Sequence, residues 1–212
     1  MKEKTALVIS GGGLGCSWSV GALLALVRKY NFTSPDILIT GSGSAGTGAY
    51  FVSGQYESIE NIWSNLLCTN KFVSLKRFWK MVDIDYLIDE VFKKQDPLDT
   101  SKIFKSKINF LVPVANAKTG EVEYFSNKDK VGVLSHPKIK KKCEAIQASP
   151  NFQLPTPNFR GADIFEILRA SKAMPFFYGK KIKIKNQKYC DNRFSSRIEL
   201  HLQKAISEYY CH

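Results

Sequence analysis

Residues 36–46 have the sequence DILITGSGSAG, in which a short apolar run leads directly into a turn of glycine and serine. The run at 36–40 is apolar and rich in β-branched side chains, which is typical of a strand buried in a parallel sheet. Small residues predict a tight turn at 41–46, and a helix is expected to begin at 47–52. The segment therefore predicts a strand, a tight turn and a helix in that order.

The same order occurs once before in the chain. The apolar run 5–9 is followed by the glycines Gly11, Gly12 and Gly13, and then by a second apolar stretch at 20–27. Alternating strands and helices are typical of a parallel sheet that helices cover on both faces. We therefore expect an α/β fold with three α/β/α layers and a mainly parallel central sheet.

The rest of the chain continues this alternation. Helical spacing of apolar residues appears at 57–67, 85–92, 163–172 and 200–210, and strand-like runs appear at 109–115, 121–125 and 182–184. No repeat or linker divides the sequence, so we expect a single domain spanning residues 1–212. The aromatic and basic segment 71–81 is open to two interpretations, a covered helix or loop and a contact with a membrane interface.

The composition narrows the class of protein. The chain is 44% hydrophobic and 24% charged, as expected for a packed globular protein, and its formal net charge of +12 favours contact with anionic lipid or nucleic acid. No nucleic-acid recognition motif accompanies this charge. Five cysteines without paired spacing suggest neither a disulfide framework nor a metal site, and no leader or spanning segment is seen. We expect a cytoplasmic protein, with peripheral contact at the membrane as a further option.

Ser44 is the candidate nucleophile. A serine hydroxyl needs a sharp strand-to-helix turn, a neighbouring base and donors for the oxyanion before it attacks an ester. Gly43, Ala45 and Gly46 surround Ser44 with small residues and predict a nucleophile elbow, although Ser42 stands where the G-x-S-x-G pattern has its first glycine. A turn of small residues without catalysis is the alternative explanation.

The glycines Gly11, Gly12 and Gly13 are candidates for an oxyanion hole, because consecutive main-chain amides without side chains can approach a developing negative charge. A dinucleotide-binding loop is the alternative. The G-x-G-x-x-G pattern fails at Gly11, where it meets Cys16, and occurs only at Gly41, Gly43 and Gly46. No acidic strand end follows about twenty residues later, so nucleotide binding is the weaker hypothesis.

Three motifs, in order, resemble the patatin-like phospholipases: SGGGLGCSWSVGALLAL at 10–26, ITGSGSAGTGAYF at 39–51 and ASKAMPFFYGKKIKIKNQKYCDNRF at 170–194. The resemblance implies a patatin-like fold, an oxyanion hole at Gly11–Gly13, Ser44 as nucleophile and Asp191 as base without a histidine. It implies no metal and no organic cofactor.

The chain departs from the family pattern near the expected site. Gly15 stands where the family usually has a basic residue, Cys16 stands where it usually has glycine, and Asn192 replaces the glycine after the catalytic aspartate. A conventional triad would need His136, His201 or His212, none of which lies in a supporting motif.

These features together predict a serine-dependent lipid acyl hydrolase of phospholipase A, lysophospholipase or esterase type, with a Ser44–Asp191 dyad. Its expected partner is a phospholipid or other lipid ester, with peripheral contact to anionic membrane and no nucleic acid. The alternative is a catalytically impaired patatin-fold protein that binds lipid or a protein partner.

Overall fold

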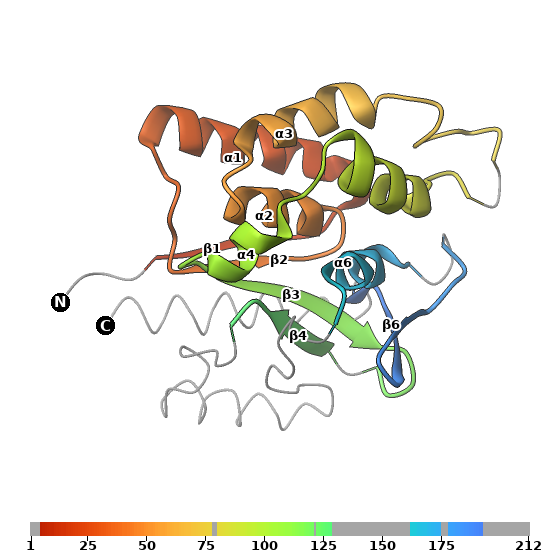
Figure 1. Cartoon of the computed structure of the whole chain (residues 1–212). Coiled ribbons are helices and arrows are strands. Elements are labelled where there is room, and N and C mark those ends of the chain that lie inside the picture. Colours follow the sequence, from red (N-terminus) through yellow and green to blue (C-terminus); the bar gives the residue numbers. More distant parts are fainter. Residues whose placement is uncertain (1–4, 78–79, 121, 129–161, 175–177, 193–212) are drawn as a thin grey trace.

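The computed structural model describes residues 5–77, 80–120, 122–128, 162–174 and 178–192 (Figure 1). The predicted helix at 200–210 and the three histidines His136, His201 and His212 lie outside these residues.

The described strands form one sheet. They are β1 (Ala6–Ile9), β2 (Ile37–Thr40), β3 (Asn109–Asn116), β4 (Val122–Ser126), β5 (Ile182–Ile184) and β6 (Gln187–Cys190). Their order is β1-β2-β3-β6-β5, and β4 pairs with β3 off this path. The pairs β1–β2 and β2–β3 are parallel, whereas β4, β5 and β6 pair antiparallel. The α/β class is confirmed, and the parallel part of this mixed sheet comprises β1, β2 and β3.

Helices α1 (Cys16–Tyr30), α2 (Ser44–Val52) and α3 (Tyr56–Asn61) lie on one side of this sheet (Figure 1). The other helical elements are η1 (Gly13–Gly15), η2 (Ile62–Leu66), η3 (Tyr86–Gln95), α4 (Thr100–Lys105) and α6 (Ile164–Lys172). Among the described helices, none has both the length and the hydrophobicity needed to cross a bilayer.

Helix α2 lies at the centre of the molecule, between the sheet and α1 (Figure 1). Every residue of α2 is buried, including the two large aromatic side chains Tyr50 and Phe51. The sheet contributes Leu38, Phe110 and Val112 to the same core, each without exposed surface. Burial of this apolar surface fixes α2, and therefore also fixes the turn that precedes it.

The pairing of β3 brings the C-terminal ends of two strands, β2 and β6, close together. Leu111 pairs with β2 and β4, and Ala115 pairs with β4 and β6. A residue in a sheet has one neighbour on each edge, so β2 and β6 lie on the same edge of β3, opposite β4. Because β2 runs parallel and β6 antiparallel to β3, their C-terminal ends face each other. The turn at 41–43 and Asp191 are the residues that follow these ends.

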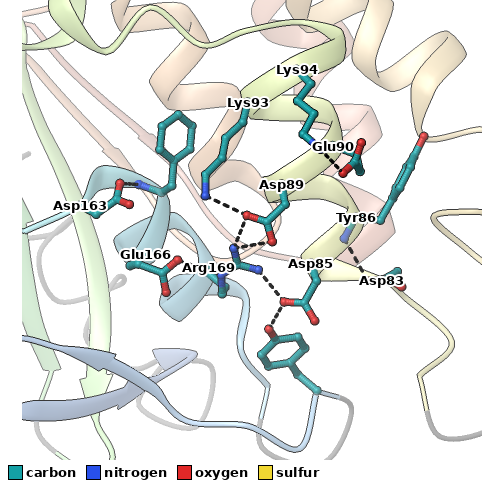
Figure 2. A network of polar contacts seen from close by, with 12 residues as sticks. Asp83, Asp85, Tyr86, Asp89, Glu90, Lys93, Lys94, Asp163, Glu166 and Arg169 are labelled. Atoms are coloured by element: carbon teal, nitrogen blue, oxygen red, sulfur yellow. Dashed lines mark hydrogen bonds and ion pairs between the residues drawn. The ribbon is translucent and has the colours of Figure 1, made fainter.

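A network of charged side chains joins α6 to η3 (Figure 2). The guanidinium of Arg169, of which only 7% of the residue surface is exposed, donates to Asp85 and Asp89 of the η3 segment and to Glu166 of α6. The Tyr178 hydroxyl donates to Asp85 as well. This network holds α6 in place beside η3, and α6 carries two residues of the candidate site at its C-terminal end.

Candidate active site

Ser42 occupies the turn between β2 and α2. Its backbone has a φ of 51°, in the left-handed region that non-glycine residues rarely adopt. Its hydroxyl donates a hydrogen bond of 2.6 Å to Oδ2 of Asp191. A serine held in a strained strand-to-helix turn with its hydroxyl on a buried carboxylate has the setting that activates a nucleophile.

Ser44, the nucleophile predicted from the sequence, is the first residue of α2 and is 1% exposed. Its hydroxyl lies 2.8 Å from the carbonyl oxygen of Gly41 and 2.9 Å from that of Ile9. These contacts tie the turn to the end of β1. The hydrogen bonding therefore directs the Ser44 hydroxyl to main-chain carbonyls and directs the Ser42 hydroxyl to Asp191.

Asp191 follows β6 and is 2% exposed. Its main-chain N–H donates to the carbonyl of Ala173, just beyond α6, at 3.0 Å. Asn192, which replaces the family's glycine, is 5% exposed and is accommodated beside it. The sequence-predicted base thus lies in the site, with Ser42 as its described hydroxyl partner.

The two glycine turns pack against each other, as the sequence predicted for a shared site. A Cβ built on Gly11 would lie 2.6 Å from Cβ of Ser42, and one built on Gly43 would lie 2.6 Å from the carbonyl oxygen of Gly13. Only glycine allows this approach. The loop Gly11, Gly12 and Gly13 is therefore adjacent to the Ser42 side chain.

The remaining elbow residues are part of α2. Ala45 has no exposed surface, and a Cβ on Gly46 would lie 2.5 Å from the ring of Phe92 in η3. Ala45 and Gly46 thus allow close packing of the helix that follows the turn.

Cys16 and Gly15 differ from the family pattern but leave the loop intact. The Cys16 side chain is buried, with Sγ 3.9 Å from the Ser10 carbonyl oxygen. A Cβ on Gly15 would meet nothing within 4 Å. The described geometry accommodates both departures.

Lys172 is a site residue that the sequence analysis missed. Its ammonium donates to the carbonyl oxygen of Ser42 at 2.7 Å, and only 6% of the residue is exposed. Burial lowers the pKa of Lys172 to about 8, while the nearby Cys16 and Asp191 act in the opposite direction. Lys172 directly follows Ser171 in the ASKAMP segment, but its burial at the end of α6 is visible only in the structure.

A cleft of about 80 Å³ opens onto Ser42. Most of the described side chains that line it are apolar, and Lys172 is the charged residue among those described. They are Leu14, Trp63, Leu67, Phe72, Val82, Ile84, Leu87 and Met174. A smaller cleft of about 20 Å³ shares Gly43, Trp63, Leu67, Leu87 and Lys172 with it. The shape and lining suit an apolar chain that ends at a reactive group beside Ser42.

No cluster of three or more His, Cys, Asp or Glu side chains that could hold a metal ion occurs in the part of the chain that the structure describes.

Comparison with known proteins adds one finding to this geometry. The family model for patatin-like phospholipases matches residues 7–192, which include both glycine turns, Lys172 and Asp191. Among curated proteins, no match is found. The family model covers well over half of the sequence, and the chain therefore belongs to the patatin-like phospholipase family, whose members are lipid hydrolases.

Proposed function

We propose that this protein hydrolyses the acyl ester bond of a phospholipid or another lipid ester, with Ser42 as nucleophile and Asp191 as base. The observation that carries the proposal is the 2.6 Å hydrogen bond from the Ser42 hydroxyl to the buried Asp191 carboxylate. It occurs at a residue whose φ of 51° matches the strained turn that a nucleophile requires.

The proposed reaction proceeds in two steps. Asp191 accepts the Ser42 proton as Oγ attacks the ester carbonyl, and the amides of the Gly11–Gly13 loop stabilise the resulting oxyanion. The alcohol leaves with the proton and an acyl-enzyme remains. Water then attacks the acyl carbon, Asp191 accepts a proton from that water and passes it to Oγ of Ser42 as the fatty acid departs.

The apolar cleft supports a lipid substrate. Its wall contains Leu14, Phe72 and Met174, and Ser42 lies on its lining. Burial of apolar surface contributes about 25 cal/mol per Å², so an acyl chain in this cleft gains binding energy along its length. Phospholipase A, lysophospholipase and general esterase activities all use this arrangement.

The Ser44–Asp191 dyad that the sequence suggested is the competing assignment, and a pair of serine variants distinguishes the two. We expect Ser42→Ala to abolish hydrolysis of a medium-chain p-nitrophenyl ester and of labelled phospholipid vesicles, because no nucleophile remains. We expect Ser44→Ala to retain turnover at a rate lower by up to about tenfold, since it loses contacts worth about 1 kcal/mol that hold the turn.

Ser53→Ala is the matched control. Ser53 is also buried and lies at the other end of α2, where its hydroxyl bonds Tyr50 and Gln55. Full activity in Ser42→Ala together with loss in Ser44→Ala would return the assignment to Ser44. Asp191→Asn is expected to be as inactive as Ser42→Ala.

The catalytically impaired alternative is tested with a fluorophosphonate, which forms a covalent bond only with an activated serine. Labelling of the folded wild-type chain that disappears in Ser42→Ala supports the enzyme. A folded chain that neither labels nor turns over substrate would favour the protein that only binds lipid.

Peripheral contact with anionic membrane is part of the same proposal. Leu14 is 49% exposed, Trp18 is 82% exposed and Leu75 is 83% exposed. Leu14 also lines the cleft, and Leu75 lies between the cleft residues Phe72 and Val82 in the chain. Exposed apolar side chains around a cleft that opens onto Ser42 fit a site that draws its substrate from a lipid surface.

A further inference from the structure

The carboxyl end of α6 binds both polar groups of the Ser42 main chain. The N–H of Ser42 donates to Oγ of Ser171 at 2.8 Å, and the carbonyl oxygen of Ser42 accepts from Nζ of Lys172 at 2.7 Å. Ser171 has no exposed surface and Lys172 is 6% exposed. Ser171 and Lys172 therefore form a clamp on the main chain of Ser42, the residue whose hydroxyl donates to Asp191.

The backbone of Ser42 needs such a clamp. A left-handed conformation in a residue with a side chain costs about 1–3 kcal/mol and persists only where the surroundings fix it. The turn's own hydrogen bonds, from Ser44 N–H to the Gly41 carbonyl and from Ala45 N–H to the Ser42 carbonyl, are 3.1 and 3.2 Å long. The contact from Lys172 is shorter than either, and it is charged, which makes it stronger.

We infer that Lys172 is a positioning residue for the nucleophile: its ammonium holds the Ser42 peptide so that Oγ points at Asp191, and it must be charged to do so. The inference rests on the proposed function of Ser42. Lysine is an unexpected choice for a structural contact in this place, because burying an ammonium costs more than burying a neutral donor. The buried ammonium is accounted for if its charge is used to hold Ser42.

The charge also acts on the groups around it. Asp191, which follows β6, and Cys16, at the start of α1, are the titratable groups whose charges act on Lys172. A cation beside the Ser42 carbonyl attracts the Asp191 carboxylate and adds to the positive potential at the start of α2. Both effects stabilise negative charge as it moves from Asp191 towards the substrate oxygen.

The inference predicts a pH dependence with a definite sign. The pKa of Lys172 is lowered to about 8 by burial, so the ammonium is charged at neutral pH and loses its proton as the pH rises through this value. Activity should therefore decline on the alkaline side. Neither Ser42 nor Asp191 needs to change its charge in this range for the decline to occur.

The test compares Lys172→Met, Lys172→Arg and Ser171→Ala with the wild-type chain between pH 6 and 10. The readouts are kcat and KM on the medium-chain ester and the rate of fluorophosphonate labelling. We expect Lys172→Met to lower kcat about 10- to 100-fold at pH 7 with little change in KM, and to lack the alkaline decline. Lys172→Arg keeps its charge at every pH in the range, so it should recover part of the rate without the decline.

Ser171→Ala removes the neutral half of the clamp, so its rate should be lower while the alkaline decline remains. A merely structural role would make the three variants differ in stability but leave the shape of the pH profile unchanged. An unchanged kcat in folded Lys172→Met, or a wild-type profile that stays flat through pH 8, would overturn the inference.

The Ser42→Ala variant separates this inference from the proposed function. If Ser42→Ala loses activity and labelling while Lys172→Met behaves like the wild type, the inference about Lys172 is contradicted and the assignment of Ser42 as nucleophile stands. If Ser42→Ala remains active, the assignment of Ser42 as nucleophile is itself contradicted.

Discussion

At the scale of the residue, Lys172 is expected to lower the stability of the fold. Below pH 8 Lys172 is charged in both the folded and the unfolded chain, so the full cost of burying the ammonium lowers the free energy of unfolding. Between about 8 and its ordinary pKa of 10.5, the folded chain releases the proton while the unfolded chain keeps it. The free energy of unfolding of the wild type therefore rises with pH across this window.

Lys172→Met should consequently be more stable than the wild type at pH 7, by about 2 kcal/mol once the lost hydrogen bond to Ser42 is taken into account. Thermal melting at a series of pH values measures this difference. The midpoint should rise by about 4–8 °C at pH 7, and the difference should shrink towards pH 10. A variant that melts below the wild type at pH 7 would contradict the prediction.

The sequence drew attention to most residues of the proposed site, but it proposed Ser44 as nucleophile and did not consider Ser42. Ser42 and Ser44 both lie in the same turn of small residues, and the pattern of G-x-S-x-G fits neither of them fully. Which serine is active depends on where β2 ends and α2 begins, and this register is set by packing of α2 against the sheet. Lys172 was missed because lysine is rarely buried, so hydropathy assigns it to the surface.

At the scale of the element, the Arg169 network determines where α6 lies. The Arg169 side chain is 8% exposed and contacts Asp85, Asp89 and Glu166 (Figure 2). Removing its guanidinium deprives two partly buried carboxylates of a shared partner, although Asp85 keeps its contacts with Tyr178 and Lys80, and Asp89 keeps its contact with Lys93. Arg169→Met should therefore lower the free energy of unfolding by roughly 1–3 kcal/mol, and it should also slow turnover because α6 carries Ser171 and Lys172.

Lys94→Met is the matched control, because Lys94 forms an ion pair with Glu90 on the same helix with side chains 65% and 44% exposed. Such an exposed pair contributes about 0–1 kcal/mol. Urea denaturation and ester hydrolysis of both variants give the comparison. Equal effects in the two variants would show that the network does not anchor α6.

The positions of most elements followed from local patterns, whereas their pairing did not. Apolar spacing predicted the helical segments at 57–67 and 85–92, which form α3 with η2 and η3. The strand run at 109–115 corresponds to β3. The antiparallel pairing of β6 with the end of β3 joins residues far apart in the chain, and no local pattern encodes it. That pairing is what brings Asp191 to Ser42.

At the scale of the whole molecule, the proposed contact with a membrane predicts one orientation, which would use the net charge of +12 and the exposed apolar side chains. The segment that precedes η3 exposes Lys71 and Lys76 together with Leu75. Arg77 and Lys80 of the same segment form ion pairs with Asp83. The two exposed lysines are thus available to anionic headgroups, while Leu75 and Trp18 are exposed for insertion among the lipids.

Trp18→Ser and Leu75→Ser should each weaken binding to vesicles of phosphatidylcholine and phosphatidylserine about 10- to 100-fold, because each removes an apolar side chain worth about 1.5–3 kcal/mol when buried. Tyr30→Ser is the control: Tyr30 is 74% exposed but ends α1, whereas Trp18 lies in its first turn, about 18 Å away at 1.5 Å per residue. Vesicle flotation measures the bound fraction, and hydrolysis of a water-soluble ester should be unchanged in all three variants. If Tyr30→Ser weakens binding as much as Trp18→Ser, the membrane contacts α1 along its length rather than at the mouth of the cleft, and the proposed orientation is incorrect.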